Sequence, residues 1–433
     1  MSPAEIGLLG IFVLVVFLFL GVHVGFALII VGFAGLACVI GLGPAIANIA
    51  LVSFAKVNDY GFAVVPLFLL MGVFVANSGI ARDAYDTVHA WVGQIKGGLA
   101  IATAGACGLF AACCGSSMAG AVTFGKVAYP EMKRLNYDPR LSTGIIAAGG
   151  TLGILIPPSI GFIIYGLLTE LSIGKLFVAG IIPGILEIVF YAVTIVILCR
   201  LNPRMGPAGP KTTVRQKVGS LRLTWPVGVL FVLVIGGIYV GVFTPTEAGG
   251  IGAFGALAIA LVRRRMSPSN FANSLLETAQ TSAMIIIMLI GAFMFNAFLA
   301  VTRIPFVASE YIVGLEVSRY VILILILFGY LVLGCFFDIY AIMILTVPII
   351  YPTIVTLGFD GIWYGVIMVR MMEIGLITPP FGLNLFGLAG TVDVPMGTMY
   401  QGVVPFVIAD ICEVVLLVAV PLLSTLLPSL MFG

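Results

Sequence analysis

Polar side chains able to bind a ligand are rare in this sequence, and they fall at interruptions of long apolar stretches. Gly115-Ser116-Ser117 interrupts residues 98–128, and Asp338 interrupts residues 320–352. Burying a carboxylate without a partner is costly, so Asp338 is expected either to bind a ligand or to cap a helix. The hydroxyls of Ser116 and Ser117 are expected either to bind a ligand or to pack as small residues in a tight turn.

Two further interruptions carry double prolines. The segments Gly150–Ser159 and Glu373–Asn384 each contain a Pro-Pro pair. Proline removes a backbone donor and disfavours helix at the preceding residue, so each segment is expected to divide a membrane span into two half-helices. Freed carbonyls favour a small cation such as Na+, and half-helix N-termini favour an anionic group. The alternative for the polar side chains here is to satisfy the kinked backbone. The residues concerned are Thr151, Ser159, Thr378 and Asn384.

Other charged residues also lie inside apolar stretches, namely Glu187, Arg370, Glu373, Asp410 and Glu413. Arg370 and Glu373 stand three residues apart, so they are expected to form a structural ion pair on one helix face. Arg303 ends an apolar stretch just before Pro305. It is expected either to reach an anionic substrate or, as is more common for such an arginine, to anchor the helix end.

The composition explains why these positions stand out. Of the 433 residues, 61% are hydrophobic and 9% are charged, whereas about 25% of a soluble domain is charged. A cytosolic enzyme, a secreted disulfide scaffold and a nucleic-acid binder are therefore excluded, and the net charge of +2 implies no anionic partner. The seven cysteines lack metal-ligand spacing and are expected to be core residues. What remains is an all-α polytopic membrane protein.

Apolar segments of about 20 residues, the length that crosses a bilayer, give the predicted spans. In the first half they are 5–20, 22–41, 61–80, 142–166 and 177–199; in the second half they are 225–243, 248–262, 278–300, 361–388 and 400–424. The interrupted stretches 98–128 and 320–352 have arms of about 15 residues, too short to cross, and are predicted to be re-entrant helical hairpins. Residues 202–224 are polar and basic, which predicts a cytoplasmic linker.

The same unit occurs twice along the chain. Tyr129-Pro130 recurs as Tyr351-Pro352, and Pro157-Pro158 recurs as Pro379-Pro380, each 222 positions later. Self-similarity at a nearly constant offset predicts a structural repeat. The first copy is expected to occupy residues 1–201 and the second residues 225–433.

The second copy is expected to sit upside down in the membrane. Each half has an odd number of predicted crossings, together with a hairpin that returns to its own side, so the chain predicts an inverted-topology repeat. Placing both termini on the periplasmic side leaves most of the 20 Lys and Arg residues in cytoplasmic loops, as the positive-inside rule requires. The first hairpin then enters from the cytoplasm and the second from outside.

Opposed hairpins and broken helices in inverted repeats are typical of a secondary transporter, because its site must be reachable from either face without an open pore. An intramembrane enzyme would need a nucleophile with a base, or a metal cluster. No constellation containing histidine lies within a predicted span, so an enzyme is not expected. A stand-alone carboxylate:Na+ symporter would share the hairpins and breaks and stays open as an alternative.

The two Gly-x-x-x-Pro-Pro segments, the Gly-Ser-Ser tip and the Phe-Phe-Asp-Ile-Tyr tip together resemble the large membrane subunit of tripartite ATP-independent periplasmic (TRAP) transporters, the DctM-like subunit, over essentially the whole chain. The resemblance implies a Na+-driven, elevator-type importer of organic acids such as C4-dicarboxylates or sialic acid, in the bacterial inner membrane. It implies a small four-span membrane subunit (DctQ-like) and a periplasmic substrate-binding protein (DctP-like) as partners. Because no further spans precede Met1, the small subunit is expected to be a separate chain.

By the same resemblance, the tips and breaks would frame two Na+ sites with the substrate between them. The expected Na+ ligands come from Gly115, Ser117, Thr151, Pro157, Asp338, Thr378 and Pro379. The expected substrate contacts come from Ser116, Ser117, Ser159, Asn384 and Arg303. Na+ is expected as the coupling ion, with no other cofactor.

Overall fold

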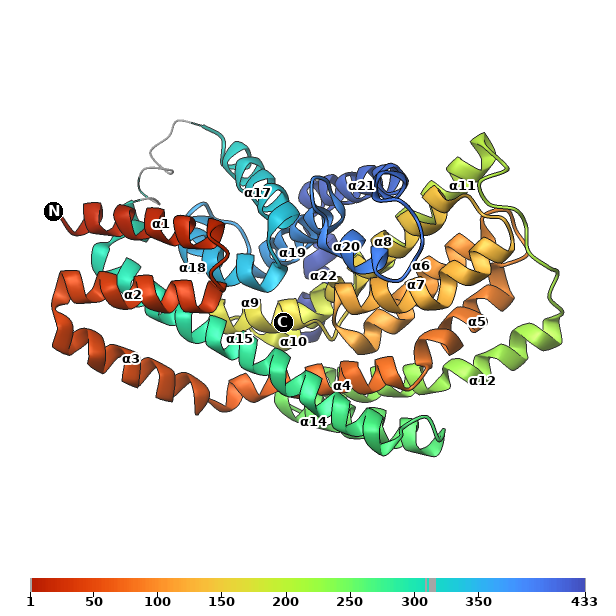
Figure 1. Ribbon diagram of the computed structural model, residues 1–433, viewed down its shortest axis with the longest axis horizontal. Coiled ribbons are helices and arrows are strands. Elements are labelled where there is room, and N and C mark those ends of the chain that lie inside the picture. Colours follow the sequence, from red (N-terminus) through yellow and green to blue (C-terminus); the bar gives the residue numbers. More distant parts are fainter. Residues whose placement is uncertain (1, 308–309, 311–316, 433) are drawn as a thin grey trace.

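A computed structural model describes residues 2–307, 310 and 317–432, and within these residues the regular structure is helical, without strands (Figure 1). The first half contains α1 (Pro3–Phe19), α2 (Val24–Ile40), α3 (Leu42–Val57), the short 3-10 helix η1 (Tyr60–Ala63), α4 (Val64–Asn77), α5 (Ile80–Val92), α6 (Gly98–Cys114), α7 (Ser117–Arg134), α8 (Pro139–Leu155), α9 (Ile160–Thr169), α10 (Ile173–Ala179) and α11 (Ile181–Leu201). The chain is therefore all-α, as the composition predicts.

The second half begins with α12 (Val214–Phe231), which continues through a π-helical turn η2 (Val232–Gly236) into α13 (Gly237–Tyr239). It continues with α14 (Pro245–Val262), α15 (Pro268–Thr302), α17 (Arg319–Phe336), α18 (Ile339–Thr356), α19 (Gly361–Ile377), α20 (Leu383–Ala389), α21 (Met396–Ala419) and α22 (Leu422–Phe432).

The helix ends of the two halves correspond at the offset found in the sequence. Adding 222 to the bounds of α7 and α8 gives the bounds of α18 and α19. Their caps correspond too, because the carboxylates of Asp138 and Asp360 accept hydrogen bonds from the first backbone N–H groups of α8 and α19. The orientation of the two copies in the membrane stays a prediction.

Several elements differ from the sequence-based map. Helices α3, α5 and α22 were not predicted. The sequence of α5 contains charged residues such as Asp83, so a search for apolar stretches does not detect it. The predicted linker 202–224 is helical from Val214, where Thr213 and Gln216 form a capping box. The hairpin arms have 17 or 18 residues, more than the predicted 15, and α7 and α18 continue past the apolar stretches. The prediction that the arms are too short to cross is wrong for α17 and α18, which are long and apolar enough to span a bilayer. Five cysteines are buried, but Cys38 and Cys412 are exposed.

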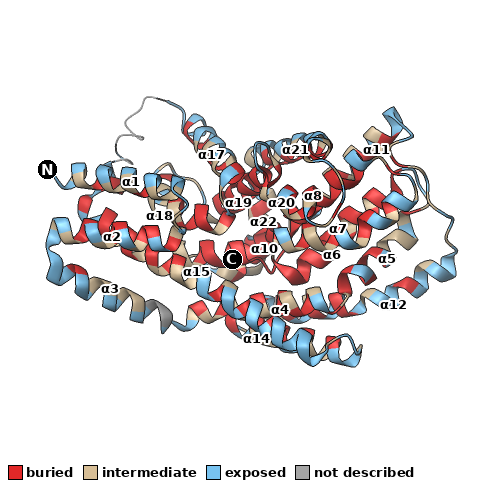
Figure 2. Ribbon diagram, in the orientation of Figure 1, coloured by how far each residue is buried: buried red, intermediate tan, exposed pale blue. Residues whose placement is uncertain are grey.

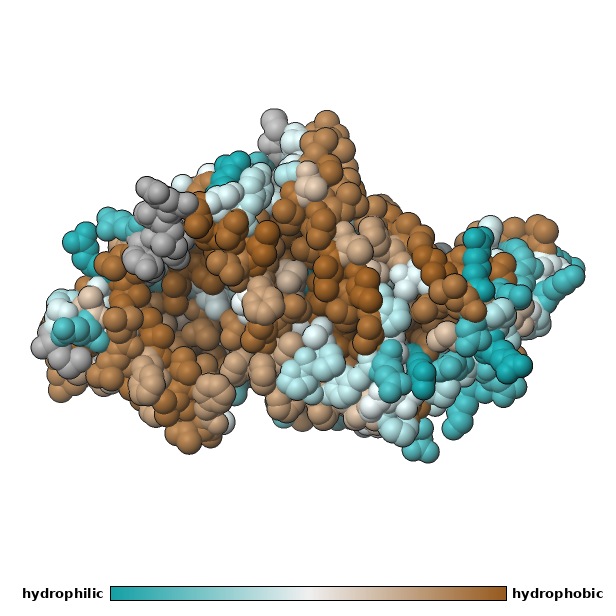
Figure 3. Space-filling view, turned by 90° about the horizontal axis from the view of Figure 1, so that it is seen from above, coloured by the Kyte–Doolittle hydropathy of each residue, from teal (hydrophilic) through white to brown (hydrophobic). Residues whose placement is uncertain are grey.

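The apolar character of the surface fits a protein that crosses a membrane several times. Among the described residues, eight helices are long and apolar enough to span a bilayer, and nine if α8 and α9, bent by 40°, form one broken span. Figure 3 shows apolar side chains over most of the visible face, with hydrophilic ones gathered at the right-hand end. Helices α5, α11 and α12 lie at that end of the molecule in Figure 1.

The core is built on the first arms of the two broken helices. Every residue of α8 from Leu141 and of α19 from Trp363 is buried, and Figure 2 shows this buried layer at the centre of the molecule. Helices α6 and α7 reach the centre from the right, and α17 and α18 reach it from the left (Figure 1). Helices α2 and α15, and likewise α4 and α14, pack together as a second layer. The two hairpins therefore converge on the core from opposite ends.

Candidate functional site

The tip of the first hairpin is shaped by close backbone contacts. Gly115 adopts φ +66°, a left-handed conformation that favours glycine, and so turns the chain from α6 to α7. A Cβ atom on Gly115 would lie 2.9 Å from the carbonyl oxygen of Pro158, and one on Gly153 would lie 2.5 Å from that of Ser116. The first tip thus rests directly on the backbone of the first broken helix, with the carbonyl oxygens of Ser116 and Pro158 at the contact.

The first break is fully enclosed. Helix α8 ends at Leu155, α9 begins at Ile160, and every residue from Thr151 to Ile160 is buried. Ser159 is the N-cap of α9, and its hydroxyl accepts a hydrogen bond from the backbone N–H of Phe162 at 3.2 Å. Ser159 therefore satisfies the kinked backbone, the alternative role predicted for polar residues at the breaks.

A hydrogen bond joins the first tip to the second break. The side-chain amide of Asn384, at the start of α20, donates to the hydroxyl of Ser117 at 2.6 Å, and both residues are buried. The amide oxygen of Asn384 is buried without a hydrogen-bond partner. A buried oxygen without a partner is costly, so a ligand or ion at this point would be stabilising.

The tip of the second hairpin is more open. Asp338 is the N-cap of α18, and its carboxylate accepts a hydrogen bond from the backbone N–H of Tyr340 at 3.0 Å. The residue is exposed rather than buried. Its capping role was one of the two predicted, and the backbone N–H groups that begin α18 hold its carboxylate at the tip. The arm behind it packs tightly, since a Cβ atom on Gly375 would lie 2.5 Å from the Cα of Gly334.

The carbonyls freed at the second break have a partner that the sequence did not suggest. The hydroxyl of Tyr400 lies 2.7 Å from the carbonyl oxygen of Pro380 and 2.8 Å from that of Phe381. Thr378 donates its hydroxyl back to the carbonyl of Ile374 at 2.6 Å. Two carbonyls that were expected to bind a cation thus lie within hydrogen-bonding distance of the Tyr400 hydroxyl. The hydroxyl of Thr378 donates to a carbonyl of its own helix.

A cavity of about 520 Å³ adjoins the first tip. Its walls come from α4, α7 and α15, and its polar lining includes Asn77, Ser116, Thr123, Lys126, Glu277 and Thr281. Lys126 supplies a cation on the same helix that Ser116 caps. The sequence did not single out Lys126, because its position near the end of an apolar stretch is that of an ordinary cytoplasmic charge.

Two of the predicted site residues lie away from the tips. The hydroxyl of Thr151 contacts the carboxylate of Glu187 at 2.7 Å and the hydroxyl of Tyr191 at 3.1 Å. Gly150 and Gly153 face the tip instead, because neighbouring positions on a helix point in different directions. Arg303 caps α15 with φ +59° and is exposed; among the described residues, no side-chain contact joins it to either tip. Its role as a helix-end residue is the alternative the structure favours.

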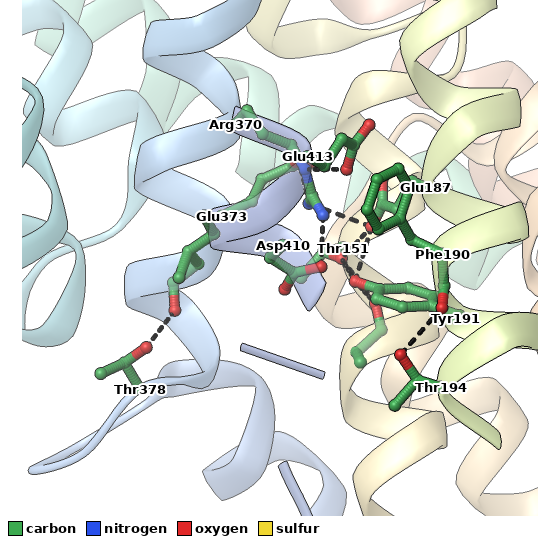
Figure 4. Close-up of polar contacts among 12 residues, drawn as sticks. Thr151, Glu187, Phe190, Tyr191, Thr194, Arg370, Glu373, Thr378, Asp410 and Glu413 are labelled. Carbon is green, nitrogen blue, oxygen red and sulfur yellow. Dashed lines mark hydrogen bonds and ion pairs between the residues drawn. The ribbon is translucent and has the colours of Figure 1, made fainter. Parts of the chain in front are cut away.

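Thr151 belongs to a buried charged cluster around Arg370 (Figure 4). The guanidinium contacts four carboxylates, those of Glu187, Glu373, Asp410 and Glu413. The predicted pair of Arg370 and Glu373 is present at 3.4 Å, and it is the longest of the four contacts. The sequence flagged all five residues as charges in apolar stretches, but it could not show that α11, α19 and α21 bring them together.

The fold and this site define a polytopic membrane protein of the transporter class, with two hairpin tips set against two broken helices. The family described as tripartite ATP-independent periplasmic transporter, DctM component, matches residues 11–423, and the chain belongs to that family. It is 36% identical, over 92% of its length and 93% of the relative's, to the C4-dicarboxylate TRAP transporter large permease protein DctM of Pseudomonas aeruginosa.

Similarity extends to relatives named for another substrate. The chain is 31% identical, over 96% of its length and 97% of the relative's, to the sialic acid TRAP transporter large permease protein SiaM of Vibrio cholerae. Among solved structures, the YdaH transporter of Alcanivorax borkumensis superposes with a TM-score of 0.60, covering 90% of this chain and 88% of that one. At 17% identity this likeness concerns the fold alone.

Proposed function

We propose that this chain is the subunit of a TRAP transporter that carries an organic acid across the bacterial inner membrane together with Na+. The observation that carries the proposal is the hydrogen bond between Ser117 and Asn384, because it joins the tip of one repeat to the break of the other. A site assembled from both repeats can open to one side of the membrane and then to the other, as transport requires.

The Na+ ions bind where backbone oxygens crowd together at the two tips. Around the first tip, the close packing of Gly115 and Gly153 supports a site made of main-chain carbonyls and the hydroxyl of Ser117. Around the second tip, the exposed carboxylate of Asp338 supplies a negative charge near the proline break. Hard oxygen ligands of this kind suit small cations. Thr151 is left out of the ligand set because its hydroxyl is engaged with Glu187.

The substrate is an organic anion. The two relatives compared above are named for C4-dicarboxylate and sialic acid, both of which are carboxylic acids. The cavity beside Ser116 is lined by Lys126, whose ammonium can pair with a carboxylate, together with the carboxylate of Glu277. The amide oxygen of Asn384, buried without a partner, offers an acceptor for a hydroxyl of the substrate or a ligand for Na+. The activity is transport, without chemical conversion of the substrate.

The transport step is an elevator-type movement of the hairpins and broken helices against the layer of α2, α4, α14 and α15. The difference in exposure between the two breaks supports this step, since one is buried and the other is open in the same conformation. Bound Na+ ions compensate the tip oxygens and allow the core to move only when it is loaded. Both chain termini lie on the periplasmic side.

Two further proteins complete the transporter. A periplasmic substrate-binding protein delivers the acid, and a small four-span membrane subunit supports the static layer of helices. Both partners follow from membership of the family rather than from a contact in this chain.

Uptake by proteoliposomes tests the proposal. The chain, its small subunit and its binding protein are reconstituted, and accumulation of candidate organic acids is measured with and without an inward Na+ gradient. We expect accumulation only with the gradient, and a marked loss in Asp338→Ala. Accumulation that is the same with and without the Na+ gradient, or that is unimpaired in Asp338→Ala, would contradict the Na+ coupling. Accumulation without the binding protein would favour a stand-alone symporter.

A further inference from the structure

The buried cluster around Arg370 has too few positive charges. One guanidinium faces four carboxyl groups, those of Glu187, Glu373, Asp410 and Glu413, and all five side chains have no exposed surface. If every carboxyl were ionised, three negative charges would remain without a counter-charge in the apolar core. The cost of burying such charges is not recovered without partners, so the cluster must take up cations or protons.

The contacts show how well the individual carboxyl groups are stabilised as anions. Glu187 has the best-stabilised anion, because one of its oxygens is 3.0 Å from Arg370 and 2.7 Å from both Thr151 and Tyr191 hydroxyls. Asp410 lies 2.5 Å from the guanidinium. Glu373 has the weakest support, a single contact of 3.4 Å to a guanidinium nitrogen that also contacts Glu187.

Each of the four carboxyl groups has one oxygen buried without a hydrogen-bond partner: Glu187 Oε2, Glu373 Oε1, Asp410 Oδ2 and Glu413 Oε1. An ionised carboxylate would leave a buried negative charge on such an oxygen, whereas a protonated one leaves only a neutral hydroxyl or carbonyl. The unpartnered oxygens therefore favour protonation of part of the cluster.

A metal ion is a poorer explanation of the excess charge. Among the residues that the structure describes, no group of three or more His, Cys, Asp or Glu side chains is arranged to hold one. The carboxyl groups instead gather around the guanidinium, which occupies the centre of the cluster (Figure 4).

The surroundings supply no further counter-charge. The neighbouring titratable groups that interact with the cluster are neutral acids, namely Tyr191 on α11, Cys107 on α6 and Tyr340 on α18. The contact from α8 is the hydroxyl of Thr151. Arg370 is thus the only cation among these groups.

We propose that the cluster is a proton-binding site, in which at least two of the four carboxyl groups carry protons in the folded protein at neutral pH, Glu373 among them. The site lies where the repeats meet, since α8 and α11 come from the first half and α19 and α21 from the second. The bound protons reduce the excess negative charge of the buried cluster, and the inference rests on these contacts and not on the transport proposal.

Infrared spectroscopy of the purified full chain tests the assignment. We expect the carbonyl band of protonated carboxyl groups at neutral pH, and we expect Glu373→Gln to remove the part contributed by one group. The matched control is Asp393→Asn, which removes an exposed carboxyl and should leave the band unchanged. Absence of the band in the unmodified chain, or a band unaffected by Glu373→Gln in folded protein, would overturn the proposal.

A second measurement keeps the test decisive if Glu373→Gln does not fold. Protons bound in the folded state but not in the unfolded state make stability fall as pH rises, by about tenfold in the folding equilibrium per proton and pH unit. The thermal midpoint of the unmodified chain should therefore fall as the pH is raised above neutral, while the carbonyl band disappears over the same range. A band that persists unchanged as the protein unfolds at alkaline pH, or a midpoint independent of pH, would contradict the site.

Discussion

The two proline breaks have the same sequence pattern but different surroundings. Residues from Thr151 to Ile160 are buried, whereas Pro379, Pro380 and Phe381 are exposed. The half-helix after the first break is capped by the side chain of Ser159, but the one after the second break has Gly382 at its N-cap and no side-chain cap. The same proline break is thus buried in the first half of the chain and exposed in the second half, within a single conformation.

The tips differ in the same direction. Gly115 and Gly153 allow the first tip to press on the backbone of the first break, while the second tip presents the exposed carboxylate of Asp338. The repeat fixes the positions of the two breaks along the chain, whereas packing by the hairpins determines which break is exposed. Exchange of these two environments is what an alternating transporter requires.

Gly153→Ala should have the largest effect on uptake, because it forces the first tip away from its break. The new Cβ atom would lie 2.5 Å from a backbone oxygen that cannot move aside as a flexible side chain would. Overpacking of this kind costs about 1–3 kcal/mol in the free energy of unfolding, and uptake should fall markedly because the first tip is displaced from the break that it contacts. Thermal unfolding and proteoliposome uptake measure the two effects.

Gly390→Ala is the matched control, since its Cβ atom would lie 3.5 Å from the nearest atom, an ordinary contact distance. It should keep the stability and uptake of the unmodified chain. Normal uptake in Gly153→Ala would show that close contact between the first tip and its break is not needed.

Cysteine labelling should separate the two breaks next. In a background without Cys38 and Cys412, the exposed cysteines among the described residues, Phe381→Cys should react with a water-soluble maleimide much faster than Ser159→Cys. Phe381 is 47% exposed, while Ser159 is fully buried. Equal rates at the two positions would remove the contrast between an open and a closed break.

Loss of the hydrogen bond between the halves should lower uptake less than Gly153→Ala does, because it removes one side-chain contact without displacing the backbone of the tip. Ser117→Ala leaves the buried amide of Asn384 without its acceptor, which costs about 1–3 kcal/mol. Asn384→Ala should cost a similar amount, and the double variant should cost less than the sum, because both changes remove one hydrogen bond. Unfolding midpoints of the three variants measure the coupling, and strictly additive losses would show that the bond contributes nothing.

Tyr400→Phe should have the smallest effect. It removes the hydroxyl that lies within hydrogen-bonding distance of the carbonyls of Pro380 and Phe381, at a break that is exposed and can be hydrated. We expect a loss of about 0.5–1.5 kcal/mol in the free energy of unfolding, the usual net value of such a bond. A loss as large as that of Gly153→Ala would mean that the second break depends on Tyr400 as strongly as the first break depends on its tip.

Local chemistry made the breaks and tips predictable. Consecutive prolines cannot continue a helix, and Gly115 followed by two serines favours a tight turn and a new N-cap, so these features follow from a few adjacent residues. The offset of the repeat then placed the equivalent features of the second half. The lengths of α7 and α18 were underestimated because these helices continue into residues beyond the apolar stretch that a search for spans detects.

Contacts across the fold were not predictable in the same way. Tyr400 lies on α21, and nothing in its neighbourhood along the chain indicates that it meets the carbonyls of Pro380 and Phe381. Thr151 was grouped with the first tip because it lies in the broken segment, but its position on α8 directs it to Glu187. A charge in an apolar stretch can be read from the sequence, whereas its partner depends on how the helices pack.

The most direct test of Na+-coupled transport is the entry of labelled sodium into proteoliposomes that contain the chain and its small subunit. Sodium entry is measured with the substrate-loaded binding protein outside, and again with the empty binding protein. If transport is coupled to Na+, sodium entry with the loaded binding protein should rise in parallel with substrate entry. Sodium entry that is the same in both cases, while substrate still accumulates, would contradict it.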